Sequence, residues 1–140
     1  MGEVWIRPNA YRAGNGRGKV PFVSLSNKEK STMYFNTKLM QDLLNDNKYV
    51  KIGIDNIKKR MYIKQTTFND IHSIKLNKNT NNKGAVITKM SLVNKLINVA
   101  GINVGDIQRY QVHKENGNLY YVNFNKPMSS MKGEIINDWQ

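Results

Sequence analysis

The chain has 140 residues, which is enough for one ordinary hydrophobic core or for two very small units that share one. It has no cysteine, which excludes disulfides and thiolate metal sites, and no apolar run is long enough to span a bilayer. Its 22 lysines and arginines outnumber 10 aspartates and glutamates, a formal net charge of +12, and such an excess favours a polyanionic partner, most often nucleic acid.

Residues 1–21 are predicted to form a flexible basic arm. Three glycines and two prolines between residues 7 and 21 are incompatible with a regular helix or strand. Two interpretations of the arm stay open: a segment that becomes ordered on phosphates, or an ordinary solvated loop. The candidate phosphate contacts in the arm are Arg7, Arg12, Arg17 and Lys19.

Residues 22–65 are predicted to form a first β-α-ββ unit. Its expected strands cover residues 22–26, 31–35, 49–54 and 60–64. The last two form a hairpin. A short helix, capped by Asn36 or Thr37, is expected before this hairpin, because apolar residues recur there at helical spacing.

Residues 66–83 are predicted to be a linker between two units. The second part of this linker, residues 77–83, is almost wholly polar and is expected to be mobile. Residues 127–140 are predicted to be a C-terminal tail.

Residues 84–126 are predicted to form a second β-α-ββ unit. The expected elements are a strand at residues 84–87, a helix at residues 89–100 and a hairpin at residues 109–124. An elbow with the pattern Gly-x-x-x-Gly-Asp, residues 101–106, follows the helix. The hairpin is expected to turn at Asn116-Gly117, because a type I′ turn needs positive φ at both central residues.

The two predicted helices share one apolar pattern. The pairs that fall at a constant offset are Leu39/Leu92, Met40/Val93, Leu43/Leu96 and Leu44/Ile97. The chain therefore contains strand, helix and hairpin twice, which indicates an internal duplication. We expect an α+β fold in which two β-α-ββ repeats pack as one pseudo-symmetric domain.

The second unit resembles the swapped-hairpin fold of AbrB-like regulators and MazE-type antitoxins. The resemblance depends on Gly101-Ile102 and Gly105-Asp106, which match the elbow of that family. The first unit departs from the family pattern, because the segment 45–48 stands in place of the elbow. The resemblance implies a DNA-binding β-barrel, built in this chain from both units, and a homodimer is among the assemblies it suggests.

In such a barrel the two hairpins would supply the inward-facing side chains. Those expected to face inward are Tyr49, Ile52, Ile54, Met61 and Ile63 from the first hairpin and Tyr110, Val112, Leu119 and Tyr121 from the second.

No catalytic or metal-binding pattern stands out. The two histidines, His72 and His113, are far apart in sequence, and the carboxylates are scattered singly, whereas a nuclease needs clustered carboxylates for Mg²⁺. Asp106 is expected to be a turn residue. We therefore expect a protein that is not an enzyme and that uses no metal and no cofactor.

The first hairpin carries the other candidate contacts to nucleic acid. Three consecutive basic residues occupy its tip and two more lie on its strands; they are Lys58, Lys59, Arg60, Lys51 and Lys64. They are expected to neutralise phosphates. The alternative is a solvated turn whose charges discourage edge-to-edge strand pairing.

These observations predict a non-catalytic nucleic-acid-binding protein of the cytoplasm without a membrane partner, and the resemblance implies an AbrB-like DNA-binding regulator. The alternative starts from a further likeness, to short proteins of phages and mobile elements. It is a phage-encoded anti-CRISPR inhibitor that acts in the bacterial host cell. Such an inhibitor would bind a Cas effector or its guide RNA, so its partner would be a ribonucleoprotein.

Overall fold

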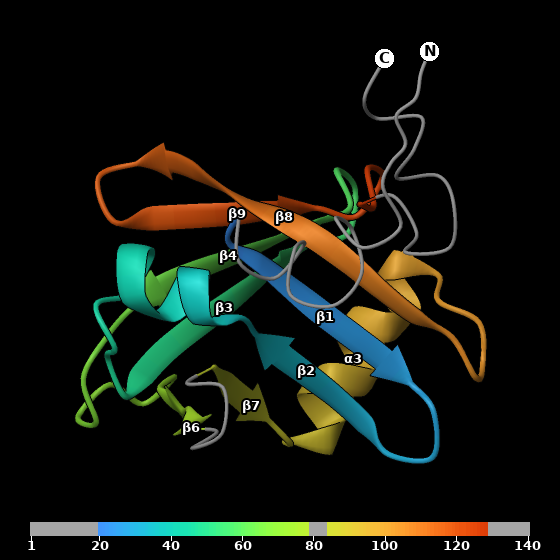
Figure 1. Cartoon of the computed structure of the whole chain (residues 1–140), viewed down its shortest axis with the longest axis horizontal. Helices are drawn as coiled ribbons and strands as arrows, with labels where there is room; N and C mark the ends of the chain where they lie inside the picture. The colour runs from blue at the N-terminus through green and yellow to red at the C-terminus, as the bar shows by residue number, and fades with distance from the viewer. Residues whose placement is uncertain (1–19, 79–83, 129–140) are drawn as a thin grey trace, which may run out of the picture.

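The computed structural model describes residues 20–78 and 84–128. In these residues strand accounts for 44% and helix for 17%. Nine antiparallel strands form one sheet in the order β5-β3-β4-β9-β8-β1-β2-β7-β6, which curls into a nearly closed barrel (Figure 1).

The first half of the chain supplies four strands and one helical segment. They are β1 (Phe22–Asn27), β2 (Ser31–Phe35), η2 (Leu39–Leu43), β3 (Tyr49–Asp55) and β4 (Arg60–Gln65). All four strands were expected from the sequence. The cap is Asn36, whose side-chain oxygen accepts a hydrogen bond of 3.0 Å from the Leu39 N–H.

The second half has three short strands before its helix, where the first half has two strands, and a hairpin after it. Its elements are β5 (Ile74–Lys75), β6 (Asn77–Lys78), β7 (Ala85–Ile87), α3 (Met90–Ala100), β8 (Ile107–Asn116) and β9 (Leu119–Asn123). The predicted helix and hairpin are confirmed, but the predicted turn is displaced by one residue. Asn116 pairs with Leu119, so Gly117 and Asn118 are the central residues, and of Asn116 and Gly117 only Gly117 has a positive φ, of 51°. The short strands β5 and β6 occupy the segment predicted to be a linker.

The predicted fold class, α+β with two packed β-α-ββ repeats, is wrong. The structure is mostly antiparallel β, and the strands of the two halves interleave in one sheet. β1 lies between β2 of its own half and β8 of the other half, and β5 and β6 together connect β3 with β7. The sequence pattern missed this arrangement because the β1–β8 and β4–β9 pairings join distant parts of the chain, and because β5 and β6 are only two residues long, too short to show an apolar alternation.

The two edges of the sheet meet at one residue. β5 pairs with β3, β6 pairs with β7, and only Leu76 separates β5 from β6 in the chain. The Leu76 side chain is buried, and its N–H donates a hydrogen bond of 2.8 Å to the Lys48 carbonyl oxygen. We call this junction the seam. It is where the barrel closes.

The core fills the inside of the barrel and extends under the helical segments. α3 contributes Val93 and Leu96, η2 contributes Leu39, and Figure 1 shows η2 and α3 at opposite ends of the sheet. On β4, Met61 and Ile63 are fully buried. Because successive side chains of a strand point to opposite faces, the residues between and beside these two point outward.

Candidate nucleic-acid interface

Three of the predicted basic residues lie on the outer face of the barrel. Arg60 and Lys64 alternate with the buried Met61 and Ile63 of β4, and Lys51 is the direct cross-strand partner of Lys64. The Lys64 side chain is exposed and that of Lys51 is 42% exposed. The structure therefore brings together three cations that are up to 13 positions apart in sequence.

The tip of the β3–β4 hairpin is a preformed turn. The Asp55 carboxylate accepts hydrogen bonds from the backbone N–H groups of Lys58 (2.9 Å) and Ile57 (3.0 Å), and the bond from Lys58 is the main reason that its pKa is lowered. Lys59 has a φ of 58°, and its carbonyl oxygen accepts a hydrogen bond from the Phe124 N–H. Lys58 and Lys59 are exposed at this tip. Asp55 is the one acidic residue of the hairpin, and its carboxylate is occupied by hydrogen bonds within the turn.

Lys51 at the edge of this face is partly neutralised. Its ammonium lies 3.3 Å from the Asp70 carboxylate, which belongs to the loop after β4. The backbone N–H of His72, then the hydroxyl of Thr66 and the Lys51 ammonium, lower the pKa of Asp70 to about 2. Asp70 therefore stays ionised at neutral pH and connects the loop to the face.

A row of three rings crosses the same face. Tyr62 on β4 is the register partner of Tyr121 on β9, and Tyr121 is the register partner of His113 on β8. The ring centroids lie 6.5 Å apart for Tyr62 and Tyr121 and 5.3 Å apart for Tyr121 and His113. We call Tyr62, Tyr121 and His113 the aromatic ladder. The strands that carry it, β4, β9 and β8, are consecutive in the sheet (Figure 1).

Arg60 is bound to the aromatic ladder. Its guanidinium carbon lies 4.4 Å from the centroid of the Tyr121 ring, within the range of a cation–π interaction, and its nitrogen lies 4.0 Å from a Glu115 carboxylate oxygen. A hydrogen bond with Tyr62, together with Tyr121 and Glu115, raises the pKa of Arg60. Its side chain is 27% exposed, so part of a permanent planar cation faces solvent.

The aromatic ladder was not predicted from the sequence. Tyr121 was expected to face inward together with Leu119, but Tyr120 and Val122 occupy the inward positions of β9. A bulge between Lys114 and Asn116 displaces the register at the turn end of this hairpin. The outward position of Tyr62 could have been predicted from the sequence, because this residue stands between two apolar residues of a strand in which inward-facing and outward-facing residues alternate.

The remaining predicted residues are divided between the tip and the arm. Lys58 and Lys59 lie at the tip beside Arg60, as the sequence predicted. Arg7, Arg12, Arg17 and Lys19 lie outside the described residues.

The inward positions predicted for Met61, Ile63, Tyr110 and Val112 are confirmed by their burial.

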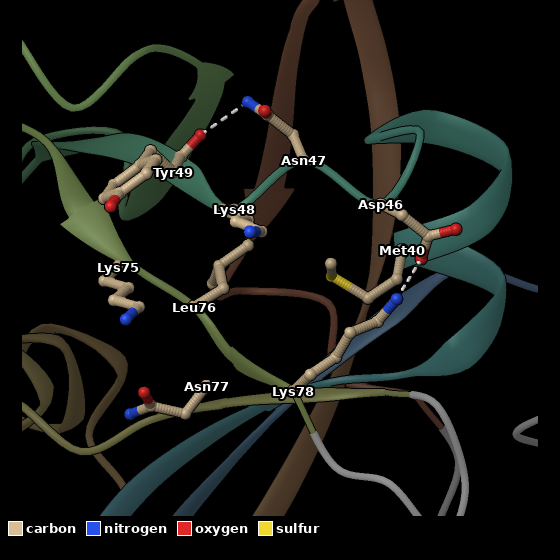
Figure 2. Close-up of a pocket in the computed structure, with 9 residues that line it drawn as sticks. All are labelled: Met40, Asp46, Asn47, Lys48, Tyr49, Lys75, Leu76, Asn77 and Lys78. Atoms are coloured by element: carbon tan, nitrogen blue, oxygen red, sulfur yellow. Dashed lines mark hydrogen bonds and ion pairs between the residues drawn. The ribbon is translucent and has the colours of Figure 1, made fainter.

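A separate hollow lies at the seam. Its volume is about 420 Å³, and Figure 2 shows Lys48, Lys75 and Lys78 around its rim, with Met40 and Leu76 among its walls. The Lys78 ammonium reaches across the hollow to the Asp46 carboxylate at 2.8 Å. This hollow opens where β6 leaves β5 to pair with β7.

No protein-family model, curated protein or solved structure matches this chain. The resemblance to AbrB-like regulators and MazE-type antitoxins therefore stays a prediction. Within residues 20–78 and 84–128, no helix has the length and apolar character needed to cross a bilayer, and no three potential metal ligands cluster.

Proposed function

We propose that the protein is a non-catalytic nucleic-acid-binding protein, and that it binds phosphates with the β3–β4 hairpin. The observation that supports this proposal is the charge of the hairpin, which carries five basic residues and one acidic residue that is engaged in its own turn. Phosphate contacts by lysine and arginine supply most of the sequence-independent affinity for nucleic acid.

The arrangement of Lys51 and Lys64 supports an anionic ligand in particular. Like charges directly opposite each other on neighbouring strands are destabilising. Asp70 compensates Lys51 from one side, whereas the Lys64 side chain projects into solvent. A phosphate held between the two ammonium groups would relieve this repulsion, so the pair is better suited to a bound polyanion than to the free protein.

The resemblance suggests a DNA-binding regulator as the subclass of this function. The hairpin tip presents the exposed Lys58 and Lys59 and an Ile57 side chain that is 93% exposed, so both charged and apolar groups are accessible to a ligand there. The anti-CRISPR alternative stays a prediction. A Cas–guide RNA complex, added as a competitor in the binding assay, distinguishes this alternative from a DNA-binding regulator.

The test reverses charge at the tip and compares it with a matched turn. Lys58→Glu/Lys59→Glu changes the net charge by four units, and Lys28→Glu/Lys30→Glu makes the same change in the exposed turn between β1 and β2. We expect the first variant to lose roughly tenfold or more in affinity for a labelled oligonucleotide at low salt, and the second to lose much less. Fluorescence anisotropy measures both. Equal losses would show that the protein binds through its overall field and not through this hairpin.

A further inference from the structure

We propose that the aromatic ladder stacks unpaired bases, so that the ligand of the β3–β4 face is single-stranded nucleic acid. This inference rests on the proposed function and specifies its ligand. It starts from an observation that phosphate binding does not explain, namely three rings aligned across three strands on a face that carries the cations.

The rings are accessible to a ligand. Tyr62 and Tyr121 are partly exposed and His113 is exposed. Beyond Tyr62 the next position across the sheet is Gly53 of β3, which has no side chain and leaves the ladder open at that end. A Cβ at residue 53 would already lie 3.9 Å from the Tyr62 Cβ, so a larger side chain there would stand directly beside Tyr62.

Cations border the ladder on both sides along the strands. Lys64 stands two residues after Tyr62 on one side and Arg60 two residues before it on the other, which in a strand is a separation of about 7 Å. A strand of nucleic acid laid along the ladder would place its bases on the rings and its phosphates within reach of these side chains. Single-strand-binding proteins combine aromatic faces and basic side chains in this way.

The stacked Arg60 guanidinium adds to the platform. Its guanidinium carbon lies over the Tyr121 ring, and bases stack on arginine guanidinium groups as well as on aromatic rings. In a duplex the base faces are already stacked on one another, so a duplex could use the cations of this face but not its rings.

A purely structural role of the ladder is the competing explanation, because aromatic cross-strand pairs also stabilise sheets. The salt dependence of binding separates the contribution of the rings from that of the cations. If the rings bind bases, Tyr62→Leu and Tyr121→Leu lower the affinity while the slope of log K against log salt stays constant, since the phosphate contacts remain. Lys51→Ala/Lys64→Ala instead lowers that slope by roughly one to one and a half units for a single strand.

The experiment uses the full chain and labelled 15-nucleotide single strands of DNA and RNA, each beside a hairpin duplex. We expect the wild type to prefer the single strands by tenfold or more. Each Tyr→Leu variant should lose roughly 5- to 150-fold in affinity for them. Tyr62→Phe keeps the ring but loses the hydrogen bond with Arg60, so it should lose much less affinity than Tyr62→Leu. Tyr34→Leu on the outer side of β2 is the matched control and should bind like the wild type.

A second measurement needs no variant. A single 2-aminopurine flanked by thymines loses fluorescence when it stacks, so binding of the wild type should quench it. The stacking inference would be overturned if single strands bound without quenching and both Tyr→Leu variants kept full affinity. A preference for the duplex would also overturn it. Either result would leave the proposed function standing. Failure of the wild type to bind any of the nucleic acids at low salt would overturn both proposals.

Discussion

Asp70 holds the loop of residues 66–73 against the edge of the basic face. Its carboxylate accepts hydrogen bonds from the His72 N–H at 2.8 Å and from the Thr66 hydroxyl at 2.7 Å, and it pairs with Lys51. In the same loop the Phe68 ring lies 6.4 Å from that of Tyr49 on β3. One carboxylate therefore sets the orientation of a lysine in the proposed interface.

Asp70→Ala should destabilise the fold in a manner that depends on pH. The folded-state pKa of Asp70 is about 2, below the ordinary 3.8, so its contribution is present above 3.8 and is lost as the pH falls toward 2. The difference in unfolding free energy between wild type and variant should be constant at higher pH and should shrink over this interval. Urea unfolding at a series of pH values measures it. A difference that is the same at pH 2 and pH 6 would contradict the assignment.

At the scale of elements, local patterns predicted the hairpins but not their partners. The alternation in residues 60–64 and the Asn-Gly pair at residues 116–117 are local signals, and both hairpins formed, the second with its turn one residue later than predicted. The pairing of Tyr62 with Tyr121 joins residues 59 positions apart, and no local pattern encodes it. The charge of the β3–β4 hairpin was therefore predictable, whereas the rings that border it depend on a long-range pairing and on the bulge in the second hairpin.

Asn36 is the polar residue that joins β1, β2 and η2. It is fully buried, its side-chain oxygen accepts hydrogen bonds from the N–H groups of Phe22 and Leu39, and its amide donates to the Val20 carbonyl oxygen at 2.8 Å. Backbone groups left without a partner in such a place cannot be satisfied by water.

Asn36→Ala should therefore lower the unfolding free energy by roughly 2–4 kcal/mol, since it leaves buried backbone groups without partners. Asn47→Ala is the control, because the Asn47 side chain likewise bonds to the backbone, its amide donating to the carbonyl oxygens of Tyr49 and Thr66, but is only half-buried. The control should cost about 1 kcal/mol, because water can replace its hydrogen bonds. Urea denaturation compares the two. Equal costs would show that burial does not decide the effect.

At the scale of the whole molecule, the barrel is closed by very few residues. The sheet is continuous from β5 to β6 through the strands, and among residues 20–78 and 84–128 its two edges are joined by the covalent chain at Leu76 and the contacts beside it. Besides the hydrogen bond from Leu76 to Lys48, the seam contains the buried Leu76 side chain and the ion pair of Lys78 with Asp46 (Figure 2). One is a buried apolar side chain and the other is an exposed ion pair, so we expect them to contribute unequally to the stability of the barrel.

Burial of Leu76 should dominate the closure of the barrel. The Leu76 side chain is 5% exposed, and replacing a buried leucine by alanine typically costs about 2–5 kcal/mol. The Lys78 and Asp46 side chains are 49% and 46% exposed, and ion pairs in such positions are worth about 1 kcal/mol or less. Leu76→Ala should therefore destabilise the protein several times more than Lys78→Ala. It should also speed the hydrogen exchange of the Leu76 amide, which donates to Lys48. If Lys78→Ala were the more damaging of the two, the barrel would be closed by the ion pair across the hollow and not by the core beneath it.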